Sequence, residues 1–99
     1  MKFDWYETKN QINIQKHGLD FKDAWQLFKN PLLARQDTSM DYGEDRWVAI
    51  GIMNTRVIVV VIVFTETEPD SIRVISLRKA TKNERTYYEK EIKNKLGPC

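Results

Sequence analysis

Apolar residues in the N-terminal third of the chain recur at helical spacing. Four of them fall at positions i, i+3, i+4 and i+7 and predict a helix with one apolar stripe facing a core. They are Phe21, Ala24, Trp25 and Phe28. Asp20 is a suitable N-cap for this helix. Asn30-Pro31 ends it, because proline cannot continue the helical hydrogen bonds.

A second helix is expected before it. Thr8 is a suitable N-cap, and the helix runs to about His17. Gly18 then supplies the left-handed residue with which many helices end. Upstream, Phe3-Asp4-Trp5 alternates apolar and polar residues and is compatible with a short edge strand.

From position 32 onward the pattern changes to that of strands. The expected strands cover residues 32–35, 47–53, 56–66 and 72–77. Within the third of these, Val57–Phe64 is continuously apolar and β-branched, so that strand is expected at the centre of a sheet, covered on both faces. The turns are predicted at Asn54-Thr55 and at Pro69-Asp70, the latter of type I, and Gln36–Asp45 is expected to be a loop.

The chain ends in a predicted helix of about residues 82–96. Thr81 and Glu84 form a T-x-x-E capping box at its start, and Gly97-Pro98 ends it. Its apolar stripe is thin: Tyr88, Ile92 and Leu96.

These elements predict an α+β fold in one domain, residues 1–99. Two N-terminal helices pack on one face of a three- to four-stranded antiparallel sheet, and a C-terminal helix follows. Short turns between consecutive strands favour a meander. Because the central strand is apolar on both faces, the second face needs a cover. The C-terminal helix, a second copy of the chain and a partner protein are the alternatives.

Composition narrows the class of protein. A length of 99 residues allows one compact core, and the composition is 41% hydrophobic and 30% charged, which is typical of a folded globular chain. The longest apolar run is too short to span a bilayer, and no export signal is recognisable, so no membrane partner is expected. Cys99 cannot form an internal disulfide, which fits a reducing cytoplasm.

Charge is distributed unevenly. Residues 1–72 carry eight Lys/Arg and eleven Asp/Glu, net −3, whereas residues 73–99 carry eight and three, net +5, which gives the overall +2. The C-terminal part is therefore the end expected to attract phosphates. A solvated basic helix is the alternative explanation.

The sequence lacks the motifs of several common kinds of functional site. One histidine and one terminal cysteine do not make a zinc site, no calcium loop is present, and no glycine-rich nucleotide-binding motif or serine-hydrolase motif occurs. No metal and no cofactor are therefore expected. RNA cleavage by its own 2′-hydroxyl remains possible, because it needs only a base, an acid and positive charge around the phosphate.

Lys16 and His17 are the candidates for proton transfer. Histidine gains and loses a proton near neutral pH, and both residues lie at the expected end of a helix, whose dipole favours the protonated form and hence an acid. The alternatives are a histidine that bonds the last helical carbonyls and a solvated lysine.

Three arginines are candidates for binding phosphate, because a guanidinium matches phosphate oxygens and stays charged. Arg46 begins one expected strand and Arg78 ends another, although Glu44 and Asp45 could simply pair with such arginines. Strict alternation places Arg73 and Arg78 on opposite faces of their strand. They can serve one site only if a β-bulge intervenes.

Motifs along most of the chain resemble the BrnT toxins of bacterial type II toxin–antitoxin modules, which are similar to RelE-like ribonucleases. The matching residues are Trp5, Glu7, Lys9-Asn10, Asn13, Lys16-His17-Gly18, Phe21, Gly43-Glu44, Arg46-Trp47, Ile50-Gly51, Arg73, Ile75-Ser76, Arg78, Ala80, Glu84-Arg85 and Tyr88. The resemblance implies a cytoplasmic, metal-independent endoribonuclease that inhibits translation and growth. It also implies a partner: a dimeric BrnA-like ribbon-helix-helix antitoxin that represses the operon and is the chain's only link to operator DNA.

The resemblance also suggests roles for residues. Arg46 and Arg78 would hold the scissile phosphate, Lys16 and His17 would transfer protons, and Glu44 would be a base or an orienting group. The expected RNA-binding cations are Arg73, Lys79 and Arg85.

The chain departs from the family pattern at three places: Tyr6 follows Trp5 where many members have aspartate, Thr67 stands in place of an expected arginine, and Leu77 replaces a small residue. Two alternatives to an active toxin therefore stay open. One is a weak or inactive homologue that binds the antitoxin and modulates repression. The other is a small domain that oligomerises through its apolar sheet face.

Overall fold

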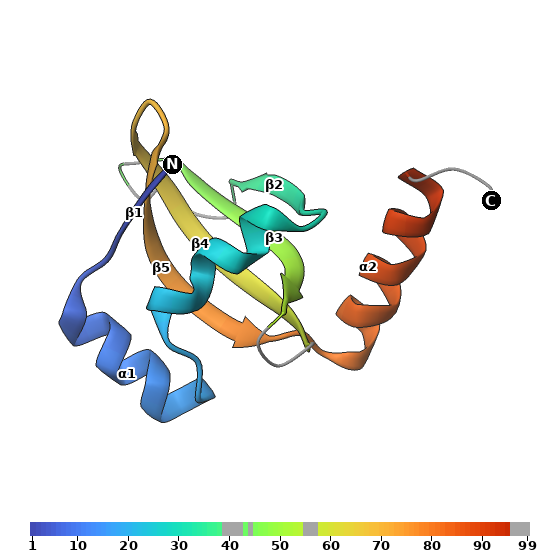
Figure 1. Ribbon diagram of the computed structural model, residues 1–99, viewed down its shortest axis with the longest axis horizontal. Coiled ribbons are helices and arrows are strands. Elements are labelled where there is room, and N and C mark those ends of the chain that lie inside the picture. The colour runs from blue at the N-terminus through green and yellow to red at the C-terminus, as the bar shows by residue number, and fades with distance from the viewer. Residues whose placement is uncertain (39–42, 44, 55–57, 96–99) are drawn as a thin grey trace.

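Five strands form one mixed sheet in the order β1-β5-β4-β3-β2 (Figure 1). This is a computed structural model that describes residues 1–38, 43, 45–54 and 58–95. The strands are β1 (Lys2–Asp4), β2 (Leu33–Asp37), β3 (Arg46–Met53), β4 (Ile58–Glu68) and β5 (Ser71–Lys79). The helices are α1 (Glu7–His17), the 3-10 helix η1 (Phe21–Lys29) and α2 (Lys82–Lys95). The α+β class matches the prediction.

The antiparallel meander is confirmed for β2 to β5, whose neighbours in sequence are neighbours in the sheet. The prediction of a wholly antiparallel sheet of three to four strands is wrong. β1 pairs with β5 in parallel, with Lys2 opposite Ser71 and Asp4 opposite Arg73. A parallel pair needs a long connection, and here all of the chain between the two strands supplies it. β1 is only three residues long, so its alternating pattern was too short for the sequence to predict that it pairs with β5.

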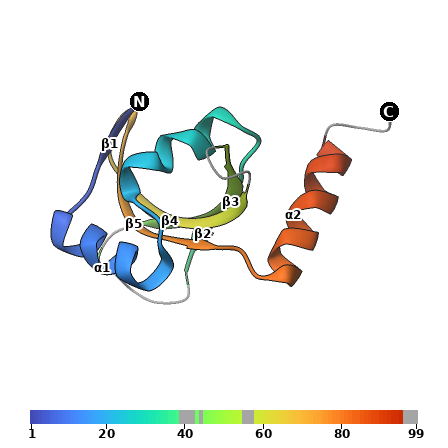
Figure 2. The same ribbon diagram turned by 60° about the horizontal axis from the view of Figure 1, so that its bottom comes forward.

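η1 covers one face of the sheet, and the core lies between them (Figures 1 and 2). Phe21, Ala24 and Leu27 have no exposed surface, whereas Trp25 is 47% exposed. The predicted stripe assumed 3.6 residues per turn and therefore included Trp25. A 3-10 helix has three residues per turn, so the inward positions recur at i, i+3 and i+6.

The helix ends follow the predictions with one exception. Gly18 is left-handed at φ 68°, and its N–H donates to the carbonyl of Ile14, as expected. Asp20 accepts from the N–H of Lys22 at the start of η1, also as expected. The N-cap of α1, however, is Tyr6 rather than Thr8, and its side chain makes no capping bond.

The β4–β5 turn differs in type from the prediction. Asp70 has φ 65°, whereas a type I turn needs a negative φ at that position. Proline followed by a residue with positive φ is the pattern of type II, and aspartate is one of the residues that tolerate it. The predicted Asn54-Thr55 turn lies partly outside the described residues, as do the Gly97-Pro98 helix stop and Cys99.

The sheet face opposite η1 is called the outer face below. The register places its residues in three rows across β2, β3, β4 and β5. The rows are Leu33–Ile50–Val61–Arg78, Arg35–Val48–Val63–Ser76 and Asp37–Arg46–Thr65–Arg73. The apolar character of both faces of β4, predicted from the sequence, is therefore confirmed for the described strand.

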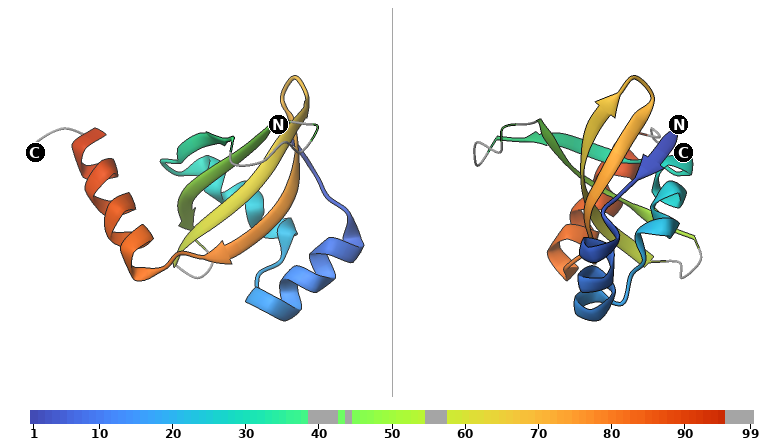
Figure 3. Two further views of the ribbon diagram at one scale, coloured as in Figure 1. Left: turned by 180° about the vertical axis from the view of Figure 1, so that it is seen from behind. Right: turned by 90° about the vertical axis from the view of Figure 1, so that its left-hand side faces the viewer.

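α2 provides only part of the cover that the outer face needs. Figure 3 shows it on the side of the sheet opposite η1, and Figure 1 shows it leaning away from the strands. Tyr88 is buried and its hydroxyl donates to the carbonyl of Pro31 at 2.6 Å. Burial raises the pKa of this phenol. Within the described ranges, no helix has the length and apolarity to cross a membrane.

Candidate functional site

α1 lies along the free edge of β5 instead of packing on the sheet face, which corrects the predicted arrangement. The buried side chain of Asn13 makes the connection. Its Nδ2 donates to the carbonyls of Leu19 (3.0 Å) and Leu77 (2.8 Å). Its Oδ1 accepts from the N–H of Leu77 at 3.1 Å. The amide thus takes the place of a neighbouring strand where β1 no longer pairs with β5.

A second buried asparagine holds α1 against the start of η1. Asn10 donates from Nδ2 to the Asp20 carboxylate at 3.0 Å and accepts from the N–H of Phe21 at 2.9 Å. Burial alone would raise the pKa of Asp20, but the bonds from the Lys22 N–H and from Asn10 lower it below its usual value. Asn10 and Asn13 therefore fix the position of everything that α1 presents to β5.

A shallow cavity of about 260 Å³ lies between α1 and β5. We call it the α1–β5 groove, and its lining residues are Lys9, Ile12, Asn13, Lys16, His17, Ile75 and Ser76. The predicted pair Lys16 and His17 thus faces one cavity together with a third basic residue, Lys9. None of the described residues that line the groove is acidic. Such a groove favours an anion.

The floor of this groove is an irregularity in β5. Val63 pairs with Ser76 but the next residue, Phe64, pairs with Val74, so Ile75 is an extra residue and forms a β-bulge. From strand alternation, Arg73 and Arg78 could share a face only if such a bulge was present. Both now belong to rows of the outer face. Bulges often occur beside active sites, where they redirect side chains.

Arg46 and Arg78 lie in different rows. Arg46 pairs with Thr65 and Arg78 with Val61, and four residues of strand correspond to about 13 Å. This separation does not fit the prediction that the two arginines grip one phosphate. Arg73 lies in the row of Arg46, and a cavity of about 370 Å³ beside it is also lined by Asp45 and Glu66. Glu44 lies outside the described residues.

Arg78 forms an ion pair with Glu84 of α2. Its Nη1 and Nη2 donate to the two carboxylate oxygens at 2.8 and 2.9 Å. Glu84 also accepts from the N–H of Thr81, whose hydroxyl accepts from the N–H of Glu84, so the predicted capping box is confirmed. The bonds from Arg78 lower the pKa of Glu84 to about 2, and the same pair raises the pKa of Arg78.

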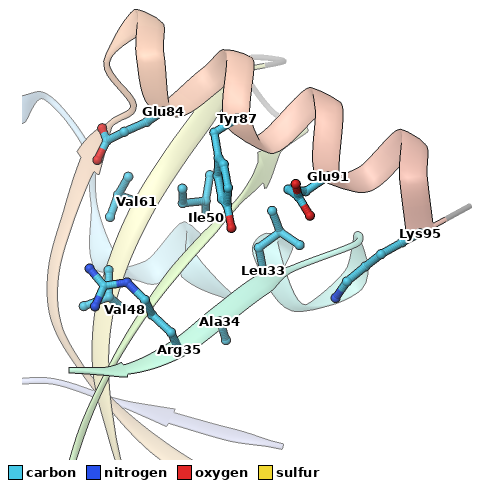
Figure 4. A pocket seen from close by; sticks show the side chains of 10 residues that line it. All are labelled: Leu33, Ala34, Arg35, Val48, Ile50, Val61, Glu84, Tyr87, Glu91 and Lys95. Carbon is cyan, nitrogen blue, oxygen red and sulfur yellow. The ribbon is translucent and has the colours of Figure 1, made fainter. Parts of the chain in front are cut away.

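Beyond this pair, α2 stands off the outer face over a cavity of about 320 Å³. Figure 4 shows Tyr87 reaching from the helix toward Leu33, Ile50 and Val61 on the strands. Lys79 and Arg85, both predicted to bind RNA, line a separate cavity of about 340 Å³ with Ile52 and Val59. The candidate cations are therefore divided among four places: the α1–β5 groove, the row of Arg46 and Arg73, the Arg78–Glu84 pair and the cavity of Lys79 and Arg85.

The Glu84–Arg78 pair should make the attachment of α2 depend on pH. Because the pKa of Glu84 is about 2 in the folded chain and 4.5 ordinarily, the stabilisation is complete above about pH 4.5 and is lost as the pH falls toward 2. An NMR titration of the Glu84 carboxyl, with hydrogen exchange at α2, measures this. Glu84→Gln, which keeps a capping box, should lack that pH dependence. A midpoint near 4.5 in the wild type would contradict the pairing.

Three polar residues that line the groove were not predicted from the sequence as site residues: Lys9, Asn13 and Ser76. Helical asparagines at positions 10 and 13 were a usable signal, because asparagine is a poor residue for a helix interior unless its side chain has a specific task. The bulge gave no sequence signal. In the described part of the chain, no group of three His, Cys, Asp or Glu residues is placed to hold a metal ion.

Comparison with known proteins identifies a family and a similar solved structure. The family described as "Ribonuclease toxin, BrnT, of type II toxin-antitoxin system" matches residues 5–84. The crystal structure of the Brucella abortus ribonuclease toxin BrnT is similar, with 36% sequence identity and a TM-score of 0.64 over 83% of this chain and 99% of that one. No curated protein sequence matches. The family match ends at Glu84, so nearly all of α2 lies beyond it.

Proposed function

The chain belongs to the BrnT family of ribonuclease toxins of type II toxin–antitoxin systems, and we propose that it is a metal-independent endoribonuclease whose active site is the α1–β5 groove. The observation that carries this assignment is the set of three basic residues, Lys9, Lys16 and His17, that face one groove beside a β-bulge. No other cavity described here gathers the predicted proton-transfer residues. The family match supports the reaction class, and the basic lining of the groove supports its location there.

The chemistry follows from RNA itself. The 2′-oxygen attacks the adjacent phosphorus, the bond from phosphorus to the 5′-oxygen breaks, and the products are a 2′,3′-cyclic phosphate and a 5′-hydroxyl. The 2′-hydroxyl proton passes to a base, and the 5′-oxygen needs a proton from an acid. Protonated His17 at the end of α1 is the acid, and Lys16 and Lys9 neutralise the phosphate. Glu44 stays a prediction, as a base or an orienting group.

The arginines have different places in this proposal. Arg73 lies three residues before Ser76 on β5, close to one end of the groove. Arg78 becomes available to RNA only when Glu84 releases it. The catalytic roles of Arg46 and Arg78, and the RNA-binding roles of Lys79 and Arg85, stay predictions.

The partners follow from the family. A type II toxin is counteracted by a protein antitoxin, so the proposal includes a BrnA-like ribbon-helix-helix antitoxin that neutralises this chain in the cytoplasm and contacts the operator DNA. RNA is the substrate, and cleavage inhibits translation and growth. The antitoxin is also a candidate for covering the part of the outer face that α2 leaves open.

Incubation of the purified chain with RNA in excess EDTA tests the proposal. We expect fragments that end in a 2′,3′-cyclic phosphate, with the same yield with and without the chelator. Intact RNA under both conditions, from a folded chain that still binds its antitoxin, would support the rival function of an inactive, antitoxin-binding homologue. Cleavage only without EDTA would contradict metal independence.

A further inference from the structure

A bulky aromatic side chain stands exposed near one end of the α1–β5 groove. Tyr6 is 58% exposed and lies between β1 and α1. The guanidinium carbon of Arg73 lies over its ring, 5.1 Å from the ring centre, which is within the range of a cation–π contact. Tyr6 is not among the residues of the buried core. The arginine thus supports the ring while much of it stays open to solvent.

The ring continues the line of groove residues on α1. Tyr6 is the N-cap of α1 and comes three residues before Lys9. Asn13 and Lys16 follow Lys9 at intervals of four and three, which places these three on one side of the helix. From Tyr6 to Lys16 the helix axis extends about 15 Å. On β5, Arg73 and Ser76 follow the same direction, because Asn13 contacts Leu77 farther along the strand. Tyr6 is therefore at one end of the groove and His17 at the other.

Two properties of the residues from Tyr6 to His17 are those of a binding site for single-stranded RNA. Proteins that bind single strands combine a positive groove for the backbone with aromatic rings on which bases stack. Here Lys9 and Lys16 supply the positive charge of the groove, and Tyr6 supplies the aromatic ring. The exposed Ile12, which also lines the groove, offers apolar contact between the two lysines. Asp4 lies opposite Arg73 in the β1–β5 register, so the nearby charge is mixed. This favours a supporting role for Arg73 and leaves phosphate binding to the lysines.

We propose that Tyr6, supported by Arg73, is a stacking platform for one base of a single-stranded RNA whose backbone follows the α1–β5 groove. The inference rests on the proposed function and adds a second binding position to it, about one helix length from His17. Stacking accepts every base, so the platform contributes affinity and positions the RNA without selecting a sequence.

Binding of a fluorescein-labelled 2′-O-methyl RNA oligonucleotide tests the platform, since an RNA without free 2′-hydroxyls cannot be cleaved. Fluorescence anisotropy gives the dissociation constant. Tyr6→Ala should bind about 5- to 150-fold more weakly, the effect of losing one base–aromatic stack. Tyr6→Phe should bind within about twofold of the wild type, because the ring remains. Trp25→Ala removes an exposed aromatic ring from η1, on the other face of the sheet, and should not change binding.

A 2-aminopurine base in the same oligonucleotide gives an independent readout, because stacking quenches its fluorescence. The quenching should persist in Tyr6→Phe and be absent in Tyr6→Leu, which keeps an apolar side chain without a flat ring. Unchanged RNA binding by Tyr6→Ala, with a wild type that binds and cleaves RNA, would overturn the platform and leave the proposed function standing. A wild type that neither binds nor cleaves RNA would overturn both. Loss of antitoxin binding with unchanged RNA binding would assign Tyr6 to a protein interface instead.

Discussion

Replacing His17 with alanine is expected to slow RNA cleavage by about 10²–10⁴-fold, the usual contribution of one proton-transfer group. His17 is an exposed residue in the last turn of α1 that lines the α1–β5 groove. Its imidazole can protonate the leaving 5′-oxygen, and without it that oxygen must leave as an anion or take a proton from water. Single-turnover cleavage of a defined RNA measures the effect.

Two controls separate proton transfer from a structural task of His17. Lys29→Ala removes an exposed cation from the last turn of η1 and should leave the cleavage rate unchanged. Added imidazole should restore part of the activity of His17→Ala, because it can enter the space that the side chain leaves. Wild-type rates from folded His17→Ala would remove this residue from the mechanism.

Replacing Asn13 with alanine is expected to lower the free energy of unfolding by about 3 kcal/mol or more. The substitution leaves the N–H and the carbonyl of Leu77 and the carbonyl of Leu19 without the partner that Asn13 provides. Each buried, unsatisfied polar group costs about 1–3 kcal/mol. Urea unfolding, followed by circular dichroism, measures the change.

Asn94→Ala is the matched control, because Asn94 is an exposed asparagine of a helix, and its effect should stay within about 0.5 kcal/mol. Asn13→Asp is a stricter test. The carboxylate can still accept from the N–H of Leu77 but brings its second oxygen against two carbonyl oxygens, so it should be at least as destabilising as alanine. An Asn13→Ala variant as stable as the control would show that this asparagine does not hold α1 to the sheet.

The parts of the fold that the sequence predicted are those set by local rules. The left-handed Gly18, the Asp20 cap and the T-x-x-E box each depend on residues within a few positions of one another. The β2–β5 meander follows from short connections, and the apolar run of β4 indicated its central position. For the same reason, Lys16 and His17 could be placed together at a helix end.

The parts that could not be predicted depend on distant segments. β1 pairs with a strand almost 70 positions later, and Asn13 bonds a backbone 64 residues away. The bulge at Ile75 is a shift in pairing between two strands that both read as regular in sequence. Because of this bulge, strict alternation assigned Arg73 and Arg78 to the wrong relative faces.

The pairing of Arg78 also changes what its mutation means. From the sequence, Arg78→Ala is expected to abolish growth inhibition with the fold intact. In the structure, the same substitution also removes the partner of Glu84 and so one of the contacts that attach α2, the other being the buried Tyr88. Glu84→Gln separates the two effects, because it removes the same ion pair and leaves the Arg78 guanidinium in place. Loss of toxicity in Arg78→Ala but not in Glu84→Gln would assign the effect to the guanidinium itself.

An NMR titration of the chain with a 2′-O-methyl RNA oligonucleotide locates the RNA-binding site most directly. If the α1–β5 groove is the active site, the largest changes in backbone amide shifts will be at Lys9, Asn13, Lys16, His17 and Ser76, with η1 unaffected. Changes confined to the cavity between α2 and the outer face, at Leu33, Ile50 and Tyr87, would place the RNA elsewhere and contradict this assignment.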